Sequence, residues 1–236
     1  MRVFVMTSDN YLPALGPFSY LFTKHWGREQ PVVVAGFSPP GFALPPNFTF
    51  HSIGDQSDYP VNKWSNALYK FLNEVEDDHF VLMLEDYWLT RPVNIDAVNI
   101  LYHYMRQFGY VIKMDLCADR LYAHGMKDYG TVSYLDLIVS MPGSPYHMSL
   151  YPGIWNKRHL LDTLVPDETP WEIELNGTTR LSHNRNCIVL GTRQKPMKIT
   201  LGLRGGESGK LILDGMMEDD VTELRSLGML KHWETE

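Results

Sequence analysis

The sequence predicts an α/β fold, in which helices flank a mixed, mainly parallel central sheet. Strand-like and helix-like segments alternate along the chain, which is typical of layered α/β proteins. Residues 79–84 (HFVLML) are continuously apolar, as expected for a central strand that is covered on both faces. The 236 residues contain no internal repeat, low-complexity tract or long linker. We therefore expect a single domain over residues 1–236.

Each expected element follows from its local pattern. Short runs of β-branched and aromatic residues predict strands, and apolar residues at helical spacing predict helices. The expected strands are residues 2–6, 31–35, 48–53, 79–84, 110–116, 131–140 and 147–151. The expected helices are residues 12–26, 63–75, 94–108 and 156–164, with a short helix beginning near Thr169 and a helical pattern within 211–236.

Charge is distributed unevenly along the chain. The net charge is -7, but residues 180–210 carry seven basic residues against one acid. This basic segment lacks the interleaved aromatic residues of proteins that bind single-stranded nucleic acid. It predicts an anion site near the C-terminus, with phosphate contacts from one or two arginines such as Arg185. A solvated basic face is the alternative.

The cysteine content and the apolar runs bear on the cellular compartment. Cys117 and Cys187 are far apart in the sequence, which indicates neither a disulfide framework nor a zinc site. The N-terminal residues lack a signal-peptide pattern, and no run approaches the roughly 20 apolar residues of a membrane span. We expect a reduced, cytoplasmic protein without an integral membrane segment.

Two adjacent acids, Glu85 and Asp86, come directly after the strand at 79–84. The carboxyl ends of strands are where open α/β sheets bind their ligands. A carboxylate pair there suits a hard divalent cation whose remaining ligands are phosphate oxygens and water. The alternative is a pair of acids that faces solvent or caps the next element.

A polar loop, Thr7-Ser8-Asp9-Asn10-Tyr11, follows the first strand at the same expected edge. Its hydroxyl and amide groups could hold a ribose or the edge of a base, and Tyr11 could stack on the base. The alternative is an Asx turn that starts a helix, which the loop residues by themselves favour.

The segment from Thr169 to Glu174 (TPWEIE) begins a helix. Thr169 and Glu172 form a capping box and Pro170 occupies the first helical position, so Glu172 has a structural role. No such role is evident for Glu174. A carboxylate one turn into a helix beside an aromatic residue is a candidate general base, and a solvated helix residue is the alternative.

Three familiar catalytic motifs are excluded. Residues 205–210 (GGESGK) look like a P-loop, but the glycine spacing is too short and Leu211 stands where Ser or Thr is needed. The sequence contains no H-E-x-x-H zinc motif and no G-x-S-x-G elbow. Zinc and serine hydrolases of those types are therefore excluded.

Two blocks of the sequence carry a family resemblance. The first consists of residues 63–68 (KWSNAL) and 80–89 (FVLMLEDYWL), and the second of residues 149–161 (SLYPGIWNKRHLL) and 170–174 (PWEIE). In this order and separation they resemble the metal-motif strand and the acceptor-side elements of bacterial glycosyltransferases with the GT-A fold.

The resemblance implies transfer of a sugar from a nucleotide-sugar donor, most simply a UDP-sugar, to an acceptor hydroxyl group. The donor half would be residues 1–115 and the acceptor half 116–236. Asp86 and Glu85 would hold Mn²⁺ or Mg²⁺, and Glu174, with Glu172 beside it, would be the base of an inverting displacement. The donor contacts would be Thr7, Ser8, Asp9, Asn10, Tyr11, Lys63 and Arg185. The acceptor contacts would be Tyr151, Trp155 and Trp171.

Two departures from the family pattern leave details open. The metal motif is Glu-Asp rather than Asp-x-Asp, which leaves open how many carboxylates bind the metal. Tyr151 stands where a glutamine is expected, which leaves acceptor recognition open.

The acceptor and the class of the protein also have alternatives. The acceptor is either a glycan, such as a surface-polysaccharide precursor, or a hydroxymethylated DNA base, as in some viral enzymes. A non-catalytic module that binds a nucleoside diphosphate with the same fold is the main alternative to an enzyme. A nucleotidyltransferase is disfavoured because no glycine-rich, basic phosphate loop follows the first strand. The oligomeric state stays open.

Overall fold

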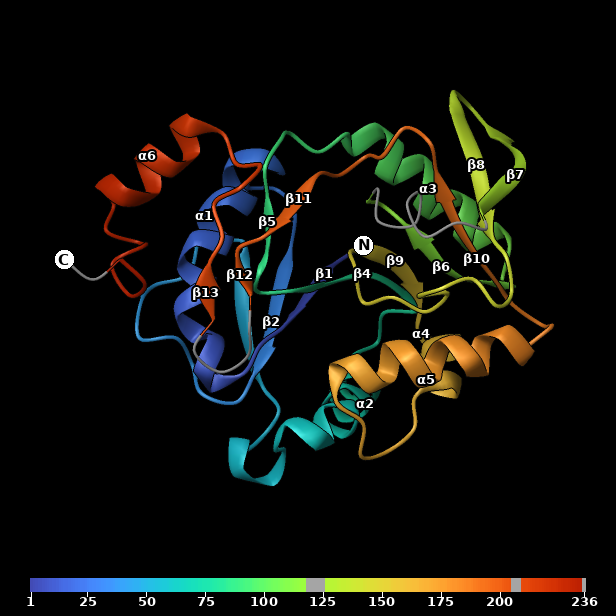
Figure 1. Ribbon diagram of the computed structural model, residues 1–236, viewed down its shortest axis with the longest axis horizontal. Helices are drawn as coiled ribbons and strands as arrows, with labels where there is room; N and C mark the ends of the chain where they lie inside the picture. The colour runs from blue at the N-terminus through green and yellow to red at the C-terminus, as the bar shows by residue number, and fades with distance from the viewer. Residues whose placement is uncertain (118–125, 205–208, 235–236) are drawn as a thin grey trace.

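The computed structural model describes residues 1–117, 126–204 and 209–234 (Figure 1). The strands are β1 (Val3–Met6), β2 (Val32–Gly36), β3 (Phe48–Ser52), β4 (His79–Leu84), β5 (Tyr87–Leu89), β6 (Val111–Asp115), β7 (Met126–Val132), β8 (Leu135–Ser140), β9 (Gly153–Asn156), β10 (Ile188–Thr192), β11 (Ile199–Leu201), β12 (Leu203–Arg204) and β13 (Lys210–Leu211). The helices are α1 (Leu15–His25), α2 (Trp64–Glu74), α3 (Ile95–Gln107), α4 (Lys157–Thr163), α5 (Pro170–His183) and α6 (Glu218–Ser226), with the 3₁₀ helices η1 (Asp9–Ala14), η2 (Gln56–Asp58) and η3 (Val61–Lys63).

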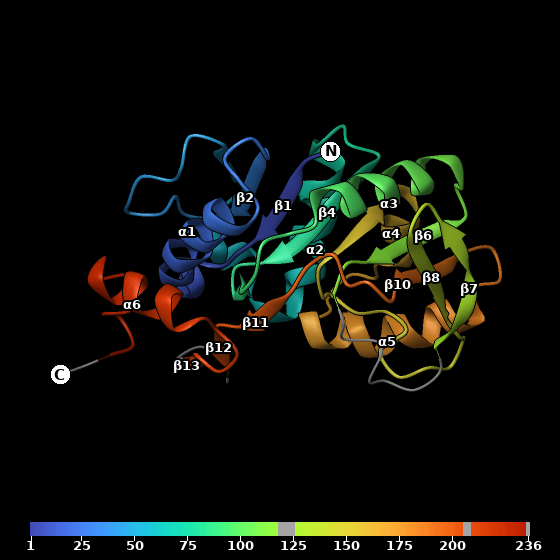
Figure 2. The ribbon, with the colours of Figure 1, turned by 90° about the horizontal axis from the view of Figure 1, so that it is seen from above.

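Among the described residues, nine strands form one sheet in the order β3-β2-β1-β4-β9-β6-β10-β8-β7. The strands β3, β2, β1 and β4 are parallel neighbours, and β6 is parallel to β10. Because β9 lies antiparallel between β4 and β6, all six of these strands point in one direction. Figure 2 shows β1 and β4 running side by side away from the N-terminus. We call the edge at which these six strands end the carboxyl edge.

Different helices cover the two faces of the sheet. The apolar residues of α2, α4 and α5 pack on one face, and those of α1 and α3 pack on the other, where Leu224 of α6 joins the same core. Within β4, Phe80 and Leu82 join the first core and Val81 and Met83 join the second. Burial on both faces thus explains why residues 79–84 are apolar without alternation.

Most expected elements of the α/β fold are confirmed to within a few residues, three are revised and one strand is wrong. The expected strand 131–140 is a hairpin of β7 and β8, in which Ser133 turns the chain with a φ of 53°. Helix α5 is a long helix of 14 residues rather than a short one. The C-terminal segment forms the short strand β13 before α6. Among the described helices, none has the length and apolar character that a membrane span requires.

The expected strand at 147–151 is wrong, and β9 lies just after it. The backbone N–H of Met148 donates to the hydroxyl of Thr178 at 3.1 Å, and that of Leu150 donates to the carboxylate of Glu174 at 2.6 Å. Side chains of α5 therefore take the hydrogen bonds that a neighbouring strand would otherwise supply.

A buried acid fixes α6 to α1. Asp220 is 1% exposed, and its carboxylate lies 2.8 Å from Nζ of Lys24 and 2.9 Å from Nε2 of His25. Burial opposes ionisation of Asp220, but the hydrogen bonds from Lys24 and His25 outweigh burial and hold the pKa of Asp220 below its usual value.

Replacement of Asp220 by asparagine is expected to lower the free energy of unfolding by about 1–2 kcal/mol at pH 7. Because folding lowers the pKa, this contribution is present above the unfolded pKa of about 3.9 and is lost as the pH falls through the folded-state pKa. Chemical denaturation between pH 7 and pH 3 should show the difference from wild type shrinking. The exposed neighbour, Asp219→Asn, is the control, and equal stability of Asp220→Asn and wild type at pH 7 would contradict this role.

Candidate functional site

The carboxyl edge brings two of the loops singled out in the sequence together. In the parallel pair of β1 and β4, Met6 is opposite Leu84, so Thr7 and Glu85 leave the sheet at the same level. The loop at 7–11 and the acidic pair Glu85–Asp86, which we call the acidic turn, are therefore neighbours. This is the place where open α/β sheets bind ligands.

The acidic turn connects β4 to β5 and is poorly solvated. Glu85 is 7% exposed, and Oδ1 of Asp86 is buried without a hydrogen-bond partner. Burial raises the pKa of Asp86 to about 7. Burial, and secondly the charge of Asp86, raise the pKa of Glu85 well above its usual value. Buried carboxylates are costly unless a cation balances them, so this turn suits a bound cation.

The two carboxylates of the acidic turn limit which metal ions could bind there. The described residues contain no group of three or more His, Cys, Asp or Glu side chains placed to hold a metal ion. A cation at Glu85 and Asp86 would therefore complete its coordination with water and with oxygens of a bound anion. Mg²⁺ and Mn²⁺ accept such an all-oxygen set, in which one or two carboxylates are joined by phosphate oxygens.

A C-terminal segment is hydrogen-bonded to the acidic turn. Strand β11 pairs with β5, and the N–H of Gly202 donates to the carbonyl oxygen of Asp86 at 2.7 Å. A Cβ atom at position 202 would overlap the ring of Trp88, so glycine is required for this close approach. The backbone of the turn is thus held from a segment far away in the sequence.

The same segment continues into a basic hairpin. Strands β12 and β13 pair antiparallel with Arg204 directly opposite Lys210, and both side chains are exposed. Directly opposed residues project from the same face, and like charges in that position destabilise a pair of strands. An anion between the two cations would offset this repulsion. Because Arg204 follows Gly202 by two residues, the pair lies beside the acidic turn.

The loop after β1 begins the 3₁₀ helix η1, as the alternative interpretation of this loop expected, but no side chain caps the start of this helix. Thr7 is buried, and Asp9 accepts hydrogen bonds from the backbone N–H and the hydroxyl of Ser38, both at 2.9 Å. Asp9 therefore holds the loop to the segment after β2. Ser8, Asp9 and Tyr11 are half-buried, and Asn10 is exposed.

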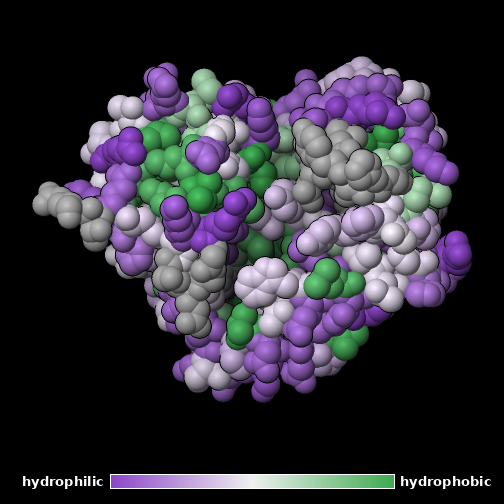
Figure 3. Space-filling model, in the orientation of Figure 1, coloured by the Kyte–Doolittle hydropathy of each residue, from purple (hydrophilic) through white to green (hydrophobic). Residues whose placement is uncertain are grey.

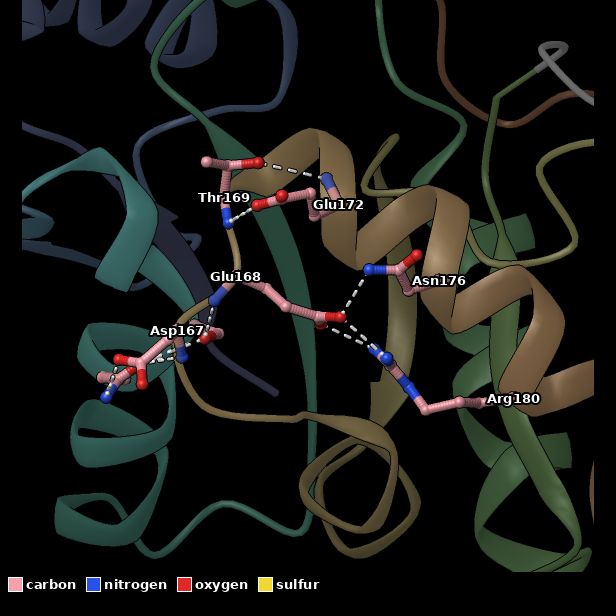
Figure 4. A network of polar contacts seen from close by, with 8 residues as sticks. Asp167, Glu168, Thr169, Glu172, Asn176 and Arg180 are labelled. Carbon is pink, nitrogen blue, oxygen red and sulfur yellow. Dashed lines mark hydrogen bonds and ion pairs between the residues drawn. The ribbon is translucent and has the colours of Figure 1, made fainter.

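A polar network fixes the N-terminal end of α5 (Figure 4). Glu168 is buried, and its carboxylate accepts hydrogen bonds from Asn176 at 2.9 Å and from two nitrogens of Arg180 at 2.8 and 2.7 Å. Its backbone N–H donates to the hydroxyl of Ser65 on α2 at 3.0 Å. Arg180, a member of the basic segment, is thus engaged by a carboxylate within the fold.

The capping box expected at the start of α5 is confirmed. Thr169 Oγ1 accepts from the N–H of Glu172 at 3.2 Å, and Glu172 accepts from the N–H of Thr169 at 2.9 Å. The hydrogen bond from the Thr169 backbone lowers the pKa of Glu172. The carboxylate of Glu172 is therefore engaged in the cap of α5, the structural role that the sequence predicts for it.

Glu174, two residues further along α5, contacts the segment that precedes β9. Its Oε1 accepts the hydrogen bond from Leu150, a structural contact that the sequence did not reveal. The ring of the next residue, Tyr151, lies 5.2 Å from the ring of Tyr87, which follows the acidic turn. Glu174, Tyr151 and the acidic turn are therefore connected through side-chain and backbone contacts.

The remaining residues singled out in the sequence lie in different places. Lys63 is exposed directly before α2, and Trp171 is 59% exposed on the first turn of α5. Trp155 is 0% exposed within β9, so the expectation that its side chain contacts an acceptor is corrected. Arg185 is also corrected, because it precedes β10 and therefore lies at the edge opposite the carboxyl edge. Within the rejected P-loop, residues 205–208 lie outside the described part of the chain.

Comparisons with known proteins bear on the fold. No protein-family model and no curated protein sequence matches the chain. Among solved structures, S. aureus TarS 1–349 in complex with UDP-GlcNAc is similar, with a TM-score of 0.55 and 12% identity over 100% of this chain and 68% of that chain. A second structure of TarS 1–349 has a TM-score of 0.51 and 14% identity over 84% of this chain and 59% of that chain. The chain has a GT-A-like fold.

The chain is shorter than the TarS chains, since it spans 59% of TarS 1–349 in one comparison and 36% of a longer TarS chain in another.

The surface of the GT-A-like fold is hollowed near the centre of the face in Figure 3. By comparison with Figure 1, this hollow lies between the part formed by α1, β12 and β13 and the part formed by α5.

Proposed function

We propose that this chain is a glycosyltransferase that moves a sugar from a nucleoside diphosphate donor to an acceptor hydroxyl group. The observation that carries the proposal is the buried acidic turn at the carboxyl edge of a GT-A-like fold. The connection of Glu174 to that turn through Tyr151 and Tyr87 supports it. The UDP-GlcNAc in the TarS complex supports a UDP-sugar as the donor.

The acidic turn would hold the metal ion. The buried Oδ1 of Asp86, which has no hydrogen-bond partner, and the adjacent carboxylate of Glu85 fit Mn²⁺ or Mg²⁺. Such an ion supplies positive charge that stabilises the diphosphate leaving group. Arg204 and Lys210 would add positive charge on the same diphosphate. Ser8, Asn10 and Tyr11 would contact the nucleoside, together with Lys63, which is exposed directly before α2.

Glu174 would act as the base of an inverting displacement. The acceptor oxygen forms a bond to the anomeric carbon, while the bond from that carbon to the diphosphate oxygen breaks and the nucleoside diphosphate leaves with the electron pair. The carboxylate of Glu174 takes the proton of the acceptor hydroxyl. A carboxylate accepts several hydrogen bonds, so the bond from Leu150 is compatible with this role.

A glycan is favoured over DNA as the acceptor. Two arginines of the basic segment are paired with acids, Arg180 with Glu168 and Arg193 with Asp128, so the segment is not a continuous free basic face. Duplex DNA binding by several free cations would fall steeply with salt concentration. We expect negligible DNA binding at 150 mM salt, and tight, salt-sensitive binding would instead favour a modified DNA base as the acceptor.

Calorimetry with UDP, with and without Mn²⁺, followed by a donor-turnover assay, tests the proposed function. We expect Mn²⁺ to strengthen UDP binding and the bound donor to be turned over. Binding without hydrolysis or transfer of any nucleotide sugar would favour the non-catalytic module.

Neutralisation of the basic hairpin is expected to weaken diphosphate binding. Arg204→Gln and Lys210→Gln should each raise the dissociation constant for UDP about 10-fold at low salt, which corresponds to about 1.4 kcal/mol for one lost charge-assisted contact. Calorimetry at 50 mM and 300 mM salt measures the effect, which should be smaller at high salt. Arg28→Gln, at the exposed C-terminal side of α1, is the control. Unchanged UDP binding in both hairpin variants would show that the basic hairpin does not contact the diphosphate.

A further inference from the structure

A fully buried lysine lies in the middle of the sheet. Lys113 on β6 is 0% exposed, and its Nζ lies 2.5 Å from Oδ1 of Asp115. The same ammonium group donates a hydrogen bond to the carbonyl oxygen of Ser149 at 2.7 Å and lies 5.1 Å from the ring centre of Trp155. A buried ion pair is weak evidence for stability, because apolar side chains of similar volume often serve a core equally well. Core stability alone therefore does not explain why a lysine is buried at this position.

The hydrogen bond from Lys113 ends on the segment that carries the acceptor-side residues. Ser149 is buried, and its hydroxyl accepts the backbone N–H of Tyr151 at 3.2 Å. The residue between them, Leu150, donates its N–H to Glu174. The segment 149–151 is thus held by Lys113 through one carbonyl group and by Glu174 through the next N–H group.

The segment 149–151 has no strand ladder to fix its conformation, because it lies outside β9. Its backbone is instead oriented by side chains from β6 and α5. Space for the lysine is provided by a glycine, since a Cβ atom at Gly153 would lie 2.5 Å from Cε of Lys113. The chain therefore accommodates a lysine at a position where a smaller apolar residue would avoid both the close approach and the desolvation of a charge.

We propose that Lys113 is a positioning residue, which orients residues 149–151 so that Glu174 and Tyr151 face the acceptor. This inference rests on the proposed function for the roles of those two residues. Lys113 is fully buried and acts through the carbonyl group of Ser149. Loss of its ammonium group frees that carbonyl group, so the segment moves and the carboxylate of Glu174 loses its fixed position against the acceptor.

Two variants test this role. Lys113→Met keeps an unbranched apolar chain but removes the ammonium group and leaves Asp115 buried. Lys113→Met/Asp115→Asn removes both charges, so no uncompensated carboxylate stays in the core. The first measurement is hydrogen exchange of the peptide that covers residues 147–152, with peptides of β1 and β4 as internal references. The second is steady-state kinetics together with calorimetry of UDP binding.

We expect amide exchange in 147–152 to rise at least about 10-fold in both variants, while β1 and β4 stay protected. The kcat/KM for the acceptor should fall about 10- to 100-fold, as expected when a base loses its fixed position, with the UDP dissociation constant within about twofold of wild type. Asp220→Asn, which destabilises the distant contact of α6 with α1, is the control and should leave exchange in 147–152 unchanged.

Unchanged exchange in 147–152, an equal change in Asp220→Asn, or wild-type acceptor kinetics in an active enzyme would each overturn the proposal. Loss of folding in both Lys113 variants would assign the lysine to core stability and overturn it as well. If the wild type transfers no sugar, the proposed function fails, and the exchange measurement still decides whether Lys113 holds the segment.

Discussion

Asp86→Asn is expected to lower sugar transfer by at least about 1000-fold, a loss of about 4 kcal/mol of transition-state stabilisation. The Oδ1 atom of Asp86 is buried without a hydrogen-bond partner, and burial raises the pKa of this acid to about 7. A carboxylate in such a place costs stability unless a cation compensates for it. The proposed metal ion is that cation, and asparagine supplies a much weaker ligand.

Three measurements separate this functional loss from misfolding. Calorimetry should show that Mn²⁺ strengthens UDP binding by the wild type but no longer by Asp86→Asn. The thermal midpoint in metal-free buffer should not fall, because the substitution removes a buried charge. Glu76→Gln, an exposed acid before the amino end of β4, is the control for transfer. Full transfer by Asp86→Asn would show that the acidic turn takes no part in sugar transfer.

Glu174→Gln is expected to lower transfer by about 100- to 10,000-fold, the range associated with loss of a general base. Glutamine keeps a side-chain oxygen that can accept the N–H of Leu150, so the segment 149–151 should stay in place. It cannot take the proton of the acceptor hydroxyl. The dissociation constant for UDP should therefore stay within about twofold of wild type while kcat falls.

The neighbouring acid on α5 provides a matched comparison for Glu174. Glu172→Gln changes the same chemical group two residues away, at the capping box with Thr169. We expect a small loss of thermal stability, consistent with about 0.5–1 kcal/mol for a weakened cap, and transfer close to wild type. A large loss of transfer in Glu172→Gln with full activity in Glu174→Gln would show that Glu172, and not Glu174, is the base.

The sheet and the acidic turn could be predicted from the sequence because both depend on local patterns. Residues 79–84 are apolar without alternation, and both faces of β4 are buried. Because a strand end defines a sheet edge, the position of Glu85 and Asp86 followed from that strand alone. The capping box at Thr169 and Glu172 is equally local, since the two residues lie within one helical turn.

The rest of the site depends on contacts between residues far apart in the sequence. Strands β12 and β13 are only two residues long, so the sequence has no periodic pattern that predicts them. The pairing of β11 with β5, followed by β12 with β13, places Arg204 rather than Arg185 near the acidic turn. The family resemblance implied an acceptor contact for Trp155, but β9 lies between β4 and β6, and Trp155 is fully buried there. The hydrogen bond from Leu150 to Glu174 joins two segments whose proximity only the fold determines.

The measurement that tests the central claim most directly is a transfer assay read by mass spectrometry. The wild type is incubated with Mn²⁺, a panel of nucleotide sugars including UDP-GlcNAc, and simple glycan and modified-DNA acceptors. The proposed function predicts that one acceptor gains the mass of one sugar, with release of the nucleoside diphosphate, and that chelation of the metal or Asp86→Asn abolishes the product. Tight binding of the nucleoside diphosphate without any sugar transfer or donor turnover across the panel would contradict it.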